Sequence, residues 1–165
     1  TIIEFLKQAG EAFELKPFGI RAMDSLRLEK SYRLIPREMS IEYSALESGL
    51  DRFVRLDKEA FIGKEALEAW QARGFENRFA TLEVHDVEDA DARGSEAIYL
   101  GDRLAGRCTS GGYGWRVGKS LALAMLRPDL AEEGTELEIE ILGKRHGATV
   151  IAESPYDPDN VALRG

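Results

Sequence analysis

The sequence has very few of the residues from which metal centres and disulfides are built. Its 165 residues include one cysteine, Cys108, and two histidines, His85 and His146. A single cysteine excludes an internal disulfide and a cysteine-based metal cluster. With two histidines, a zinc site would need carboxylates that no motif groups together. Nothing marks a Ser-His-Asp set either, so we predict neither a metal ligand nor a catalytic residue in this sequence.

Long apolar runs and an excess of basic residues are also missing. The longest apolar run, Leu121–Leu126, is far too short to cross a bilayer, and the N-terminal residues lack the pattern of a signal peptide. The net charge of −8 argues against nucleic acid, whose phosphates would be repelled. We therefore expect no nucleic-acid partner, no membrane partner and a cytoplasmic location. A small anionic ligand stays compatible with the sequence, because a few local arginines decide its binding.

The sequence does contain enough apolar residues for a core. Hydrophobic residues make up 44% and charged residues 32%, which is typical of a globular protein and excludes a disordered tail. The length suits one domain or two small ones. The chain starts at Thr1 and runs directly into a helical pattern, and we interpret this as the boundary of a fragment.

Two helices are predicted near the N-terminus. Apolar residues spaced by four, three and four positions indicate an amphipathic helix over residues 2–15, and Pro17 ends it. A second helix is expected over residues 21–31, with three side chains inward and two outward. The inward side chains are Ala22, Met23 and Leu26, and the outward ones are Arg27 and Lys30.

The next segments predict one strand and a third helix. Alternation over residues 50–56 is typical of a strand. Residues 63–73 have a helical pattern, and Gly74 is expected to end this helix as a left-handed C-cap. The expected buried side of the helix consists of Ala66, Leu67 and Trp70.

After residue 74, short strands replace the helices. The first is expected over residues 78–85, with Ala80, Leu82 and Val84 on one face, and an acidic loop follows it. In a later strand, large apolar residues alternate with glutamates, so one face is buried and the other is solvated. The further strands are a hairpin over 97–108 that turns at Gly101-Asp102, a strand from Leu121 onward, the alternating strand Leu137-Ile139-Ile141, a turn at Gly143-Lys144, and a closing strand over 148–152.

These patterns predict an α+β fold in two parts. An α/β part occupies residues 1–74, and a small antiparallel β-barrel domain occupies residues 75–165. Four or more strands with short turns and no helix favour a barrel, with a sandwich as the alternative. The boundary is expected near Phe75.

Three motifs in the sequence resemble those of one protein family. They are Gly19–Lys30 (GIRAMDSLRLEK), Phe61–Leu67 (FIGKEAL) and Thr109–Ala124 (TSGGYGWRVGKSLALA). They resemble, in the same order, the folate-dependent aminomethyltransferases, the family of the glycine cleavage system T protein. The first motif is similar to the folate module of dimethylglycine and sarcosine dehydrogenases. The resemblance implies that residues 1–74 are the C-terminal part of the folate-binding domain and that residues 75–165 are the family's C-terminal β-barrel.

The resemblance also implies a reaction for the complete enzyme. An upstream flavin domain with FAD would oxidise an N-methyl amine, and the folate unit would capture the one-carbon group as 5,10-methylenetetrahydrofolate. The expected ligand is therefore tetrahydrofolate, and the expected partner is the upstream half of the same chain. In this family an aspartate of that first half is proposed to orient the reacting folate nitrogen, so the isolated fragment is expected to be inactive. The sequence does not select between dimethylglycine, sarcosine and other amines.

Two other functions are alternatives to this one. The first is a non-catalytic module that docks against a flavin domain or a second subunit. The second is a folate-binding iron–sulfur assembly factor. Such proteins have a cysteine-containing motif where this chain has Phe61–Glu65, and the one cysteine of this chain, Cys108, lies elsewhere. A free β domain would bind no folate, whereas a folate unit rejoined to its first half would bind it.

Arg21 and Met23 are the first candidates for folate binding. In the T protein the start of this signature helix borders the folate pocket, and an arginine there contacts folate. Met23 takes the place of that arginine here, and Arg21 lies two residues earlier. A methionine is suited to form a soft wall against a flat pterin or benzoyl ring. The pattern alone is also typical of a helix with a solvated basic face and a buried methionine.

Arg52 and Phe53 are the next candidates. Related proteins often carry an aromatic residue that faces the pterin here, and an arginine can stack on a flat ring or pair with a glutamate tail. A surface arginine is the alternative. Nearby, Glu47 matches the Leu-Glu of the family's Pro-Leu-Glu turn, although Ala45 replaces the proline. We expect Glu47 to be a turn carboxylate that bonds a backbone amide.

Tyr113 and Trp115 are the last candidates. They lie in Ser110–Lys119, which contains four glycines but lacks the spacing of nucleotide-binding loops. We predict an irregular connection between barrel strands that presents these two aromatic residues. They would serve as recognition residues or as a hydrophobic plug under the barrel.

Overall fold

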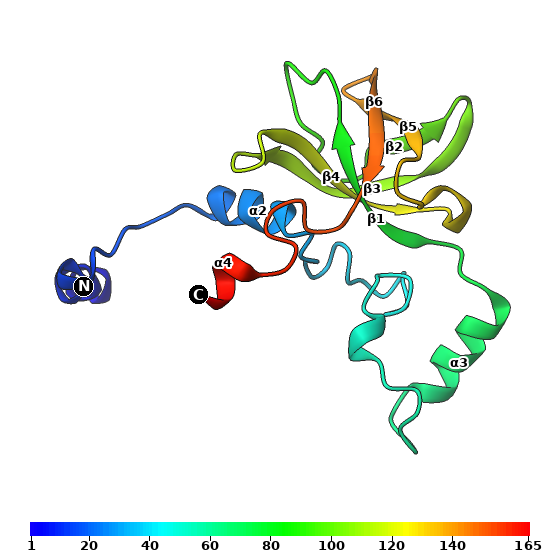
Figure 1. Ribbon diagram of the computed structural model, residues 1–165, viewed down its shortest axis with the longest axis horizontal. Coiled ribbons are helices and arrows are strands. Elements are labelled where there is room, and N and C mark those ends of the chain that lie inside the picture. Colours follow the sequence, from blue (N-terminus) through cyan, green and yellow to red (C-terminus); the bar gives the residue numbers. More distant parts are fainter.

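Six antiparallel strands form the main body of the protein. The computed structural model describes residues 1–165, and its strands close into a barrel in the order β1-β4-β3-β2-β5-β6 (Figure 1). The strands are β1 (Arg78–Val84), β2 (Ala97–Leu100), β3 (Arg103–Gly114), β4 (Lys119–Leu126), β5 (Glu136–Ile141) and β6 (Lys144–Ile151). Pairing of β1 with β6 closes the barrel. The predicted small antiparallel barrel is therefore confirmed.

Alternation along the strands fills the barrel. Leu82 in β1 and Ile139 in β5 are fully buried, and they belong to one apolar cluster to which every strand contributes. Burial of each large aliphatic side chain contributes about 1.5–3 kcal/mol. Tight turns join β2 to β3 at Gly101-Asp102 and β5 to β6 at Leu142-Gly143. Both predicted core faces, Ala80-Leu82-Val84 and Leu137-Ile139-Ile141, are confirmed.

Strand β3 is longer than the sequence pattern predicts. It continues to Gly114, so the irregular connection expected over residues 110–119 is wrong for its first half. Only residues 115–118 form the turn to β4. At Gly111 an added Cβ atom would lie 2.5 Å from the carbonyl oxygen of Ala92. The glycine therefore permits the segment before β2 to approach the strand closely.

The helices lie outside the barrel. The α-helices are α1 (Ile2–Gly10), α2 (Ile20–Glu29), α3 (Lys64–Arg73) and α4 (Val161–Arg164), and short 3-10 helices span Glu11–Phe13, Asp51–Phe53 and Pro128–Leu130. Helix α2 packs against β3 and β4, whereas α1 and α3 project away from the barrel (Figure 1). Helix α1 begins with a capping box formed by Thr1 and Glu4. None of the helices combines the length and apolarity needed to span a membrane.

Three local predictions before the barrel are wrong. The strand expected over residues 50–56 is absent, because this segment forms the 3-10 helix Asp51–Phe53 and has no neighbouring strand to pair with. The helix expected over residues 2–15 stops at Gly10 and continues only as a short 3-10 helix. Gly74 is the C-cap of α3 as predicted, but its φ of 88° and ψ of 159° are an extended glycine conformation rather than the expected left-handed one.

The faces of α2 are opposite to those predicted. Met23 and Leu26 are 49% and 58% exposed, whereas the Arg27 side chain is only 11% exposed. The buried residues of α2 are Leu28 and Glu29, so the helix turns an apolar row away from the barrel. The misassigned side chains are Ala22, Met23 and Leu26, which are exposed, and Arg27 and Lys30, which are partly buried.

Helix α3 forms as predicted but buries none of its residues. Leu67 and Trp70 are partly covered, and Ala66 is exposed, so the predicted buried side is wrong. The guanidinium of Arg73 lies 4.4 Å from the centroid of the Trp70 ring. Arg73 of the same helix thus covers the Trp70 indole, and the barrel does not contact this side of α3.

Candidate functional site

One pocket lies between α2 and the turn that joins β3 to β4. Its volume is about 340 Å³, and we call it the aromatic pocket. It brings together three of the predicted folate-binding residues, Arg21, Tyr113 and Trp115. The full lining is Arg21, Asp24, Ser25, Leu28, Asp89, Ala90, Asp91, Arg93, Gly111, Gly112, Tyr113 and Trp115.

Tyr113 and Trp115 form an edge-to-face pair in the aromatic pocket. Their ring centroids are 5.0 Å apart, and their planes meet at 73°. Trp115 is 81% exposed, which excludes a plug under the barrel for this residue. The Ser25 hydroxyl donates to the carbonyl oxygen of Tyr113 at 2.6 Å and so ties α2 to the end of β3. An open aromatic pair on a fixed backbone is suited to stacking against a flat ligand.

A second pocket lies at the other end of α2. It has a volume of about 450 Å³, and we call it the basic pocket. It contains two more of the predicted folate-binding residues, Arg52 and Phe53. The full lining is Lys30, Tyr32, Arg33, Met39, Gly49, Leu50, Arg52, Phe53, Glu153, Ser154, Pro158 and Asn160.

The three cations of the basic pocket differ in how far the protein already uses them. Arg33 makes a bidentate pair with Glu153, at 2.7 and 3.0 Å. Lys30 donates to two backbone carbonyl oxygens. The guanidinium of Arg52 lies 4.6 Å from the centroid of the Phe53 ring and takes part in none of the chain's ion pairs. Arg52 is therefore the cation best placed to answer an anionic ligand.

Met23, the sixth predicted residue, lines neither pocket. It lies on the side of α2 that points away from the barrel. The structure thus separates the six predicted residues into three groups: the aromatic pocket, the basic pocket and the outer side of α2. Their common feature is that α2 is beside all of them.

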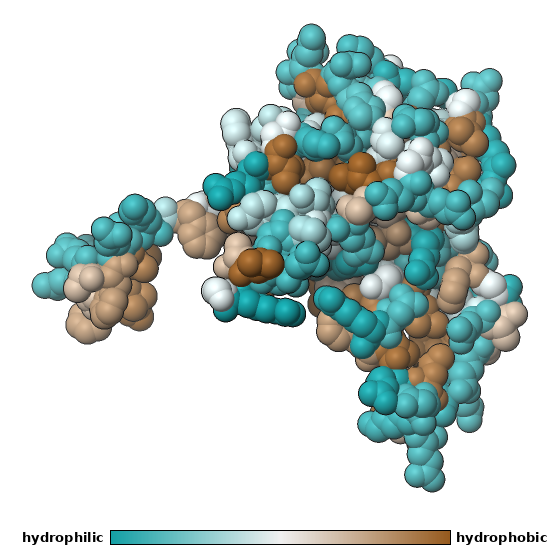
Figure 2. Space-filling view, in the orientation of Figure 1, coloured by the Kyte–Doolittle hydropathy of each residue, from teal (hydrophilic) through white to brown (hydrophobic).

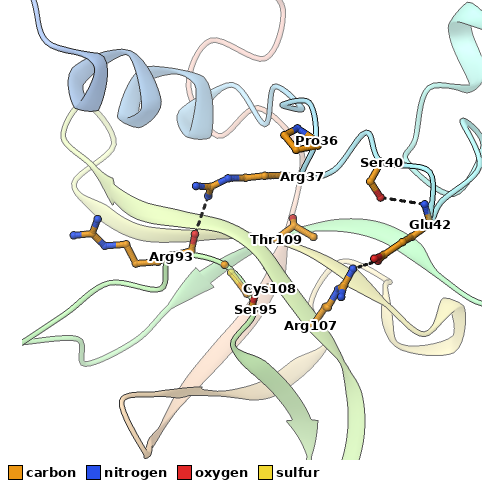
Figure 3. A pocket seen from close by; sticks show the side chains of 10 residues that line it. Pro36, Arg37, Ser40, Glu42, Arg93, Ser95, Arg107, Cys108 and Thr109 are labelled. Atoms are coloured by element: carbon orange, nitrogen blue, oxygen red, sulfur yellow. Dashed lines mark hydrogen bonds and ion pairs between the residues drawn. The ribbon is translucent and has the colours of Figure 1, made fainter.

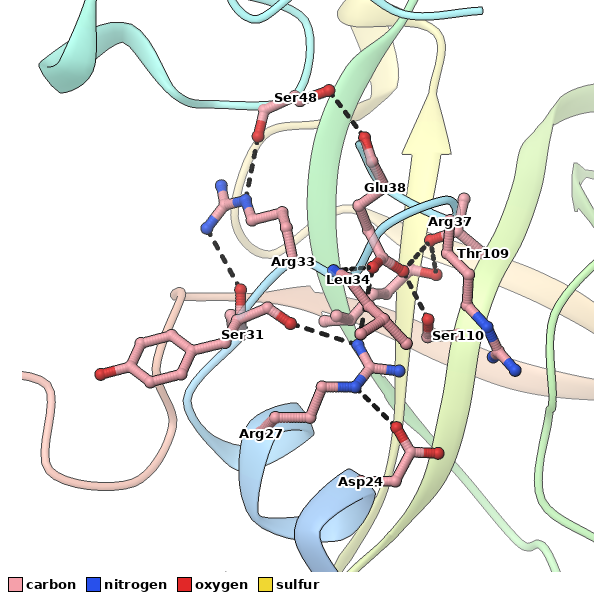
Figure 4. Close-up of polar contacts among 12 residues, drawn as sticks. Asp24, Arg27, Ser31, Arg33, Leu34, Arg37, Glu38, Ser48, Thr109 and Ser110 are labelled. Atoms are coloured by element: carbon pink, nitrogen blue, oxygen red, sulfur yellow. Dashed lines mark hydrogen bonds and ion pairs between the residues drawn. The ribbon is translucent and has the colours of Figure 1, made fainter. Parts of the chain in front are cut away.

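A buried carboxylate network surrounds Glu38, a residue that no sequence pattern marked as functional. Its side chain is fully buried and accepts hydrogen bonds from the hydroxyls of Thr109 (2.6 Å) and Ser110 (2.5 Å) and from the backbone N–H of Leu34 (2.9 Å) (Figure 4). The Arg27 guanidinium lies 3.5 Å from the same carboxylate. A buried charge with these partners is strongly fixed in place.

An irregularity in β3 makes the Glu38 network possible. Neighbouring side chains of a regular strand point to opposite faces. The β3–β4 register shifts between Cys108 and Ser110, and this bulge lets Thr109 and Ser110 reach one carboxylate. No local sequence pattern indicates such a contact, because Glu38 lies 71 and 72 residues from these two partners.

Two more buried glutamates connect the N-terminal residues to the barrel. Glu47 accepts from the N–H groups of Ser44, Glu76 and Asn77, which confirms the prediction of a turn carboxylate that bonds backbone amides. Glu29 accepts from the backbone N–H groups of Arg116 and Val117 in the β3–β4 turn, at 2.5 and 3.1 Å. The two carboxylates therefore fix the start of β1 and the turn that carries Trp115.

A third, polar pocket beside β3 holds the single cysteine (Figure 3). Cys108 is buried, and its Sγ donates to the carbonyl oxygen of Ser110. Burial, reinforced by the nearby Glu96 carboxylate, raises the pKa of the Cys108 thiol well above its usual value. A thiol held protonated in this way is a poor nucleophile. Of the arginines around this pocket, Arg107 is already paired with Glu42.

Two domain models of one protein family match two parts of this chain. The model of the "Glycine cleavage T-protein C-terminal barrel domain" matches residues 77–157, and that of the "GCVT N-terminal domain" matches residues 1–58. Mitochondrial dimethylglycine dehydrogenase of Mus musculus is 40% identical over 154 residues, which cover 93% of this chain and 18% of that protein. A probable aminomethyltransferase of Thermococcus kodakarensis is 35% identical over 167 residues, which cover 96% of this chain and 40% of that protein.

A solved structure has the same fold. The glycine cleavage system aminomethyltransferase T from Bartonella henselae superposes with a TM-score of 0.83 at 21% identity, over 94% of this chain and 44% of that one. The chain thus spans less than half the length of each of these three proteins.

Proposed function

The chain belongs to the glycine cleavage T-protein family, and from that premise we propose that it is part of a tetrahydrofolate-dependent aminomethyltransferase-type unit. In this proposal the unit captures the one-carbon group of an oxidised N-methyl amine as 5,10-methylenetetrahydrofolate. The observation that carries the proposal is the position of α2, the helix of the signature motif. Its residues line the aromatic pocket, Lys30 directly after it lines the basic pocket, and Met23 lies on its outer side.

The residues of the basic pocket fit a folate. Its flat ring system needs apolar or aromatic walls, which Phe53, Tyr32 and Met39 offer. Its glutamate tail needs a cation without a partner, which Arg52 offers. The side-chain oxygen of Asn160 is enclosed without a hydrogen-bond partner, and it would accept from a ligand N–H group. In the proposal, Arg21, Tyr113 and Trp115 form a further part of the ligand surface.

The chain's own residues would contribute position rather than proton transfer. Holding two reactants close and excluding water can supply a large part of a rate enhancement. The folate supplies the amine nitrogens that receive the one-carbon group. We propose that oxidation of the amine needs an FAD domain in a longer polypeptide. The chain alone should then make no methylenetetrahydrofolate.

The proposal can be tested in a hybrid in which this chain replaces the matching 154 residues of mouse dimethylglycine dehydrogenase. We call it the dehydrogenase hybrid. Arg52→Gln should weaken tetrahydrofolate binding about tenfold, because one charge-assisted contact contributes about 1.5 kcal/mol. Flavin reduction by dimethylglycine should not change. Calorimetric titration with tetrahydrofolate measures the first effect, and stopped-flow absorbance measures the second.

Arg127→Gln is the matched control for this test. Arg127 is a surface arginine that pairs with Asp129 at 3.2 Å, and it lines neither pocket. Its replacement should leave folate affinity unchanged. Equal affinities for Arg52→Gln, Arg127→Gln and the unmodified hybrid would remove Arg52 from the site. No folate binding by the unmodified hybrid would favour the second candidate function, a non-catalytic docking module, to which the exposed apolar side of α2 also lends support.

A further inference from the structure

The pocket beside β3 that holds Cys108 gathers positive charge in an otherwise acidic chain, and we call it the polar pocket (Figure 3). Its volume is about 340 Å³, and only one of its ten lining residues is hydrophobic. Arg37, Arg93 and Arg107 line it together with a single carboxylate, that of Glu42. The whole chain has a net charge of −8, so the excess of arginine is a local property of this pocket.

Two of the three arginines have no acidic partner. Arg107 pairs with Glu42, whereas Arg37 and Arg93 take part in none of the chain's ion pairs. The Arg37 guanidinium donates one hydrogen bond, at 2.8 Å, to the backbone carbonyl oxygen of Arg93 (Figure 3). A guanidinium has five N–H donors. Most donors of these two exposed side chains therefore remain available to a ligand.

The segment that carries Arg93 is fixed by its own contacts. The Glu96 carboxylate accepts from the backbone N–H groups of Arg93 and Gly94 at 2.8 and 2.7 Å, so an incoming anion would meet side chains rather than these backbone donors. Gly94 has φ 130°. A Cβ atom added to it would lie 2.7 Å from the carbonyl oxygen of Thr109 and 3.7 Å from a guanidinium nitrogen of Arg37. Glycine thus lets this segment lie against β3 and beside Arg37.

Two serine hydroxyls in the lining supply further donors. The Ser40 Oγ accepts the backbone N–H of Glu42 at 3.2 Å, which leaves its own proton free to donate. Ser95 is exposed, and its backbone has φ 78°, a conformation that is uncommon for residues other than glycine. Backbone strain of this kind gathers at functional sites. The polar pocket therefore combines two free cations with two hydroxyls.

The polar pocket is unsuited to an apolar ligand. Figure 2 shows apolar side chains gathered on the protruding end that holds α1, whereas hydrophilic side chains cover most of the barrel in this view. Sites for small ligands commonly enclose about 300–1,000 Å³, so the volume of about 340 Å³ suits a small molecule. The remaining choice is a small molecule that carries negative charge.

We propose that the polar pocket binds the phosphate group of a small phosphorylated metabolite. Such a group carries nearly two negative charges at neutral pH and has three acceptor oxygens. Two guanidiniums and two hydroxyls from separate segments can surround it, whereas one guanidinium fork already matches a planar carboxylate. The inference goes beyond the proposed function. Of the residues in the polar pocket only Arg93 also lines the aromatic pocket, and none lines the basic pocket.

The test is a titration of the full chain with inorganic phosphate, followed through its backbone amide NMR signals. The signals of Gly94 and Ser95 should shift and saturate at roughly millimolar phosphate. Separate titrations with sodium malonate, a dicarboxylate, and with sodium chloride at matched ionic strength are compared with it. Malonate should bind about tenfold more weakly, because fewer donors reach its oxygens. Sodium chloride should produce no saturating shift.

Substitutions then assign the binding to the arginines. Arg37→Gln should weaken phosphate binding about tenfold, because one charge-assisted contact is lost. Arg103→Gln is the matched control, since Arg103 is an exposed arginine of the same strand β3 that pairs with Asp129 and lies outside the polar pocket. It should leave the phosphate affinity unchanged. Both side chains are exposed, so circular dichroism should show folded variants with unchanged melting temperatures.

A third variant should strengthen binding, which a damaged fold could not do. Glu42→Gln removes the only carboxylate of the lining and frees Arg107, so phosphate should bind severalfold more tightly. Equal phosphate affinities of Arg37→Gln and Arg103→Gln would overturn the inference. So would equal shifts with sodium chloride, or tighter binding of malonate than of phosphate. Tetrahydrofolate affinity of the dehydrogenase hybrid is a separate measurement, so either proposal can fail alone.

Discussion

The barrel and the residues before it use their apolar side chains in opposite ways. All six strands contribute to one buried cluster, whereas α1 and α3 bury no residue at all. The barrel therefore contains its own core, whereas α1 and α3 leave their apolar side chains exposed or only partly covered. Between them, Glu29, Glu38 and Glu47 fix the intermediate segment to the barrel through buried hydrogen bonds. One chain thus combines a barrel that buries its own core with helices that bury few of their apolar side chains.

The largest expected effect comes from placing a charge inside the barrel. Ile139→Asp removes a fully buried side chain and buries a carboxylate without partners, which should cost about 5 kcal/mol or more and unfold the barrel. Glu138→Ser, one position away on the solvated face of β5, should stay within about 0.5 kcal/mol. Thermal melts followed by circular dichroism measure both. Equal tolerance of the two changes would contradict the assigned faces of β5.

Next in size is the loss of the Glu38 network. Glu38→Ala removes the acceptor of the Ser110 hydroxyl and of the Leu34 N–H, and it removes one partner each from Thr109 and Arg27, which should cost about 3 kcal/mol. The matched control is Glu42→Ala, since Glu42 forms an exposed pair with Arg107 that contributes at most about 1 kcal/mol. Urea unfolding gives both free energies. If both variants lose the same small amount, the network does not fix the intermediate segment.

A smaller and different effect is expected where the barrel meets α2. Trp115→Leu should leave stability unchanged because the indole is exposed, but it should weaken tetrahydrofolate binding to the dehydrogenase hybrid by up to about tenfold, since stacking contributes about 0.5–1.5 kcal/mol. Trp70→Leu, on α3 and outside both pockets, is the control and should not change folate affinity. A lower affinity with both variants, or with neither, would take the aromatic pocket out of the ligand surface.

The smallest effect is expected in α1. Leu6 is 56% exposed, so Leu6→Ala in the chain alone should change the free energy of unfolding by less than about 0.5 kcal/mol. Leu82→Ala, the same substitution inside the barrel, should cost about 2–5 kcal/mol. Denaturant titrations of the two variants compare the regions directly. A large loss with Leu6→Ala would mean that α1 already packs within this chain.

Sequence patterns predicted the buried faces of the barrel strands but not those of the helices. The alternation of Leu137, Ile139 and Ile141 with glutamates specified β5, because one of its faces is buried in the barrel and the other meets water. The same logic assigned the wrong face of α2. Met23 and Leu26 are apolar, but the barrel contacts the opposite side of the helix. Periodicity shows that a face is suited to burial and does not show what buries it.

The residues of the candidate site could be predicted only in part. The resemblance identified α2, and the structure brought Arg21 together with Tyr113 and Trp115 in one pocket. Glu38 could not be predicted, because a bulge in β3 selects its partners. The strand expected over residues 50–56 does not form, because no other strand lies beside this segment to pair with it. The roles of the six candidate residues, the division near residue 74 and the cytoplasmic location stay predictions.

The most direct test of the account is the fate of the one-carbon group in the dehydrogenase hybrid. Met23→Glu places a charge on the outer side of α2, where Met23 is expected to form an apolar wall of the folate site in the complete unit. With dimethylglycine and tetrahydrofolate, the unmodified hybrid should yield mainly 5,10-methylenetetrahydrofolate. The Met23→Glu variant should reduce its flavin at the same rate but release most of the carbon as formaldehyde. An unchanged yield of methylenetetrahydrofolate from a folded variant would contradict the account and leave α2 as scaffold alone.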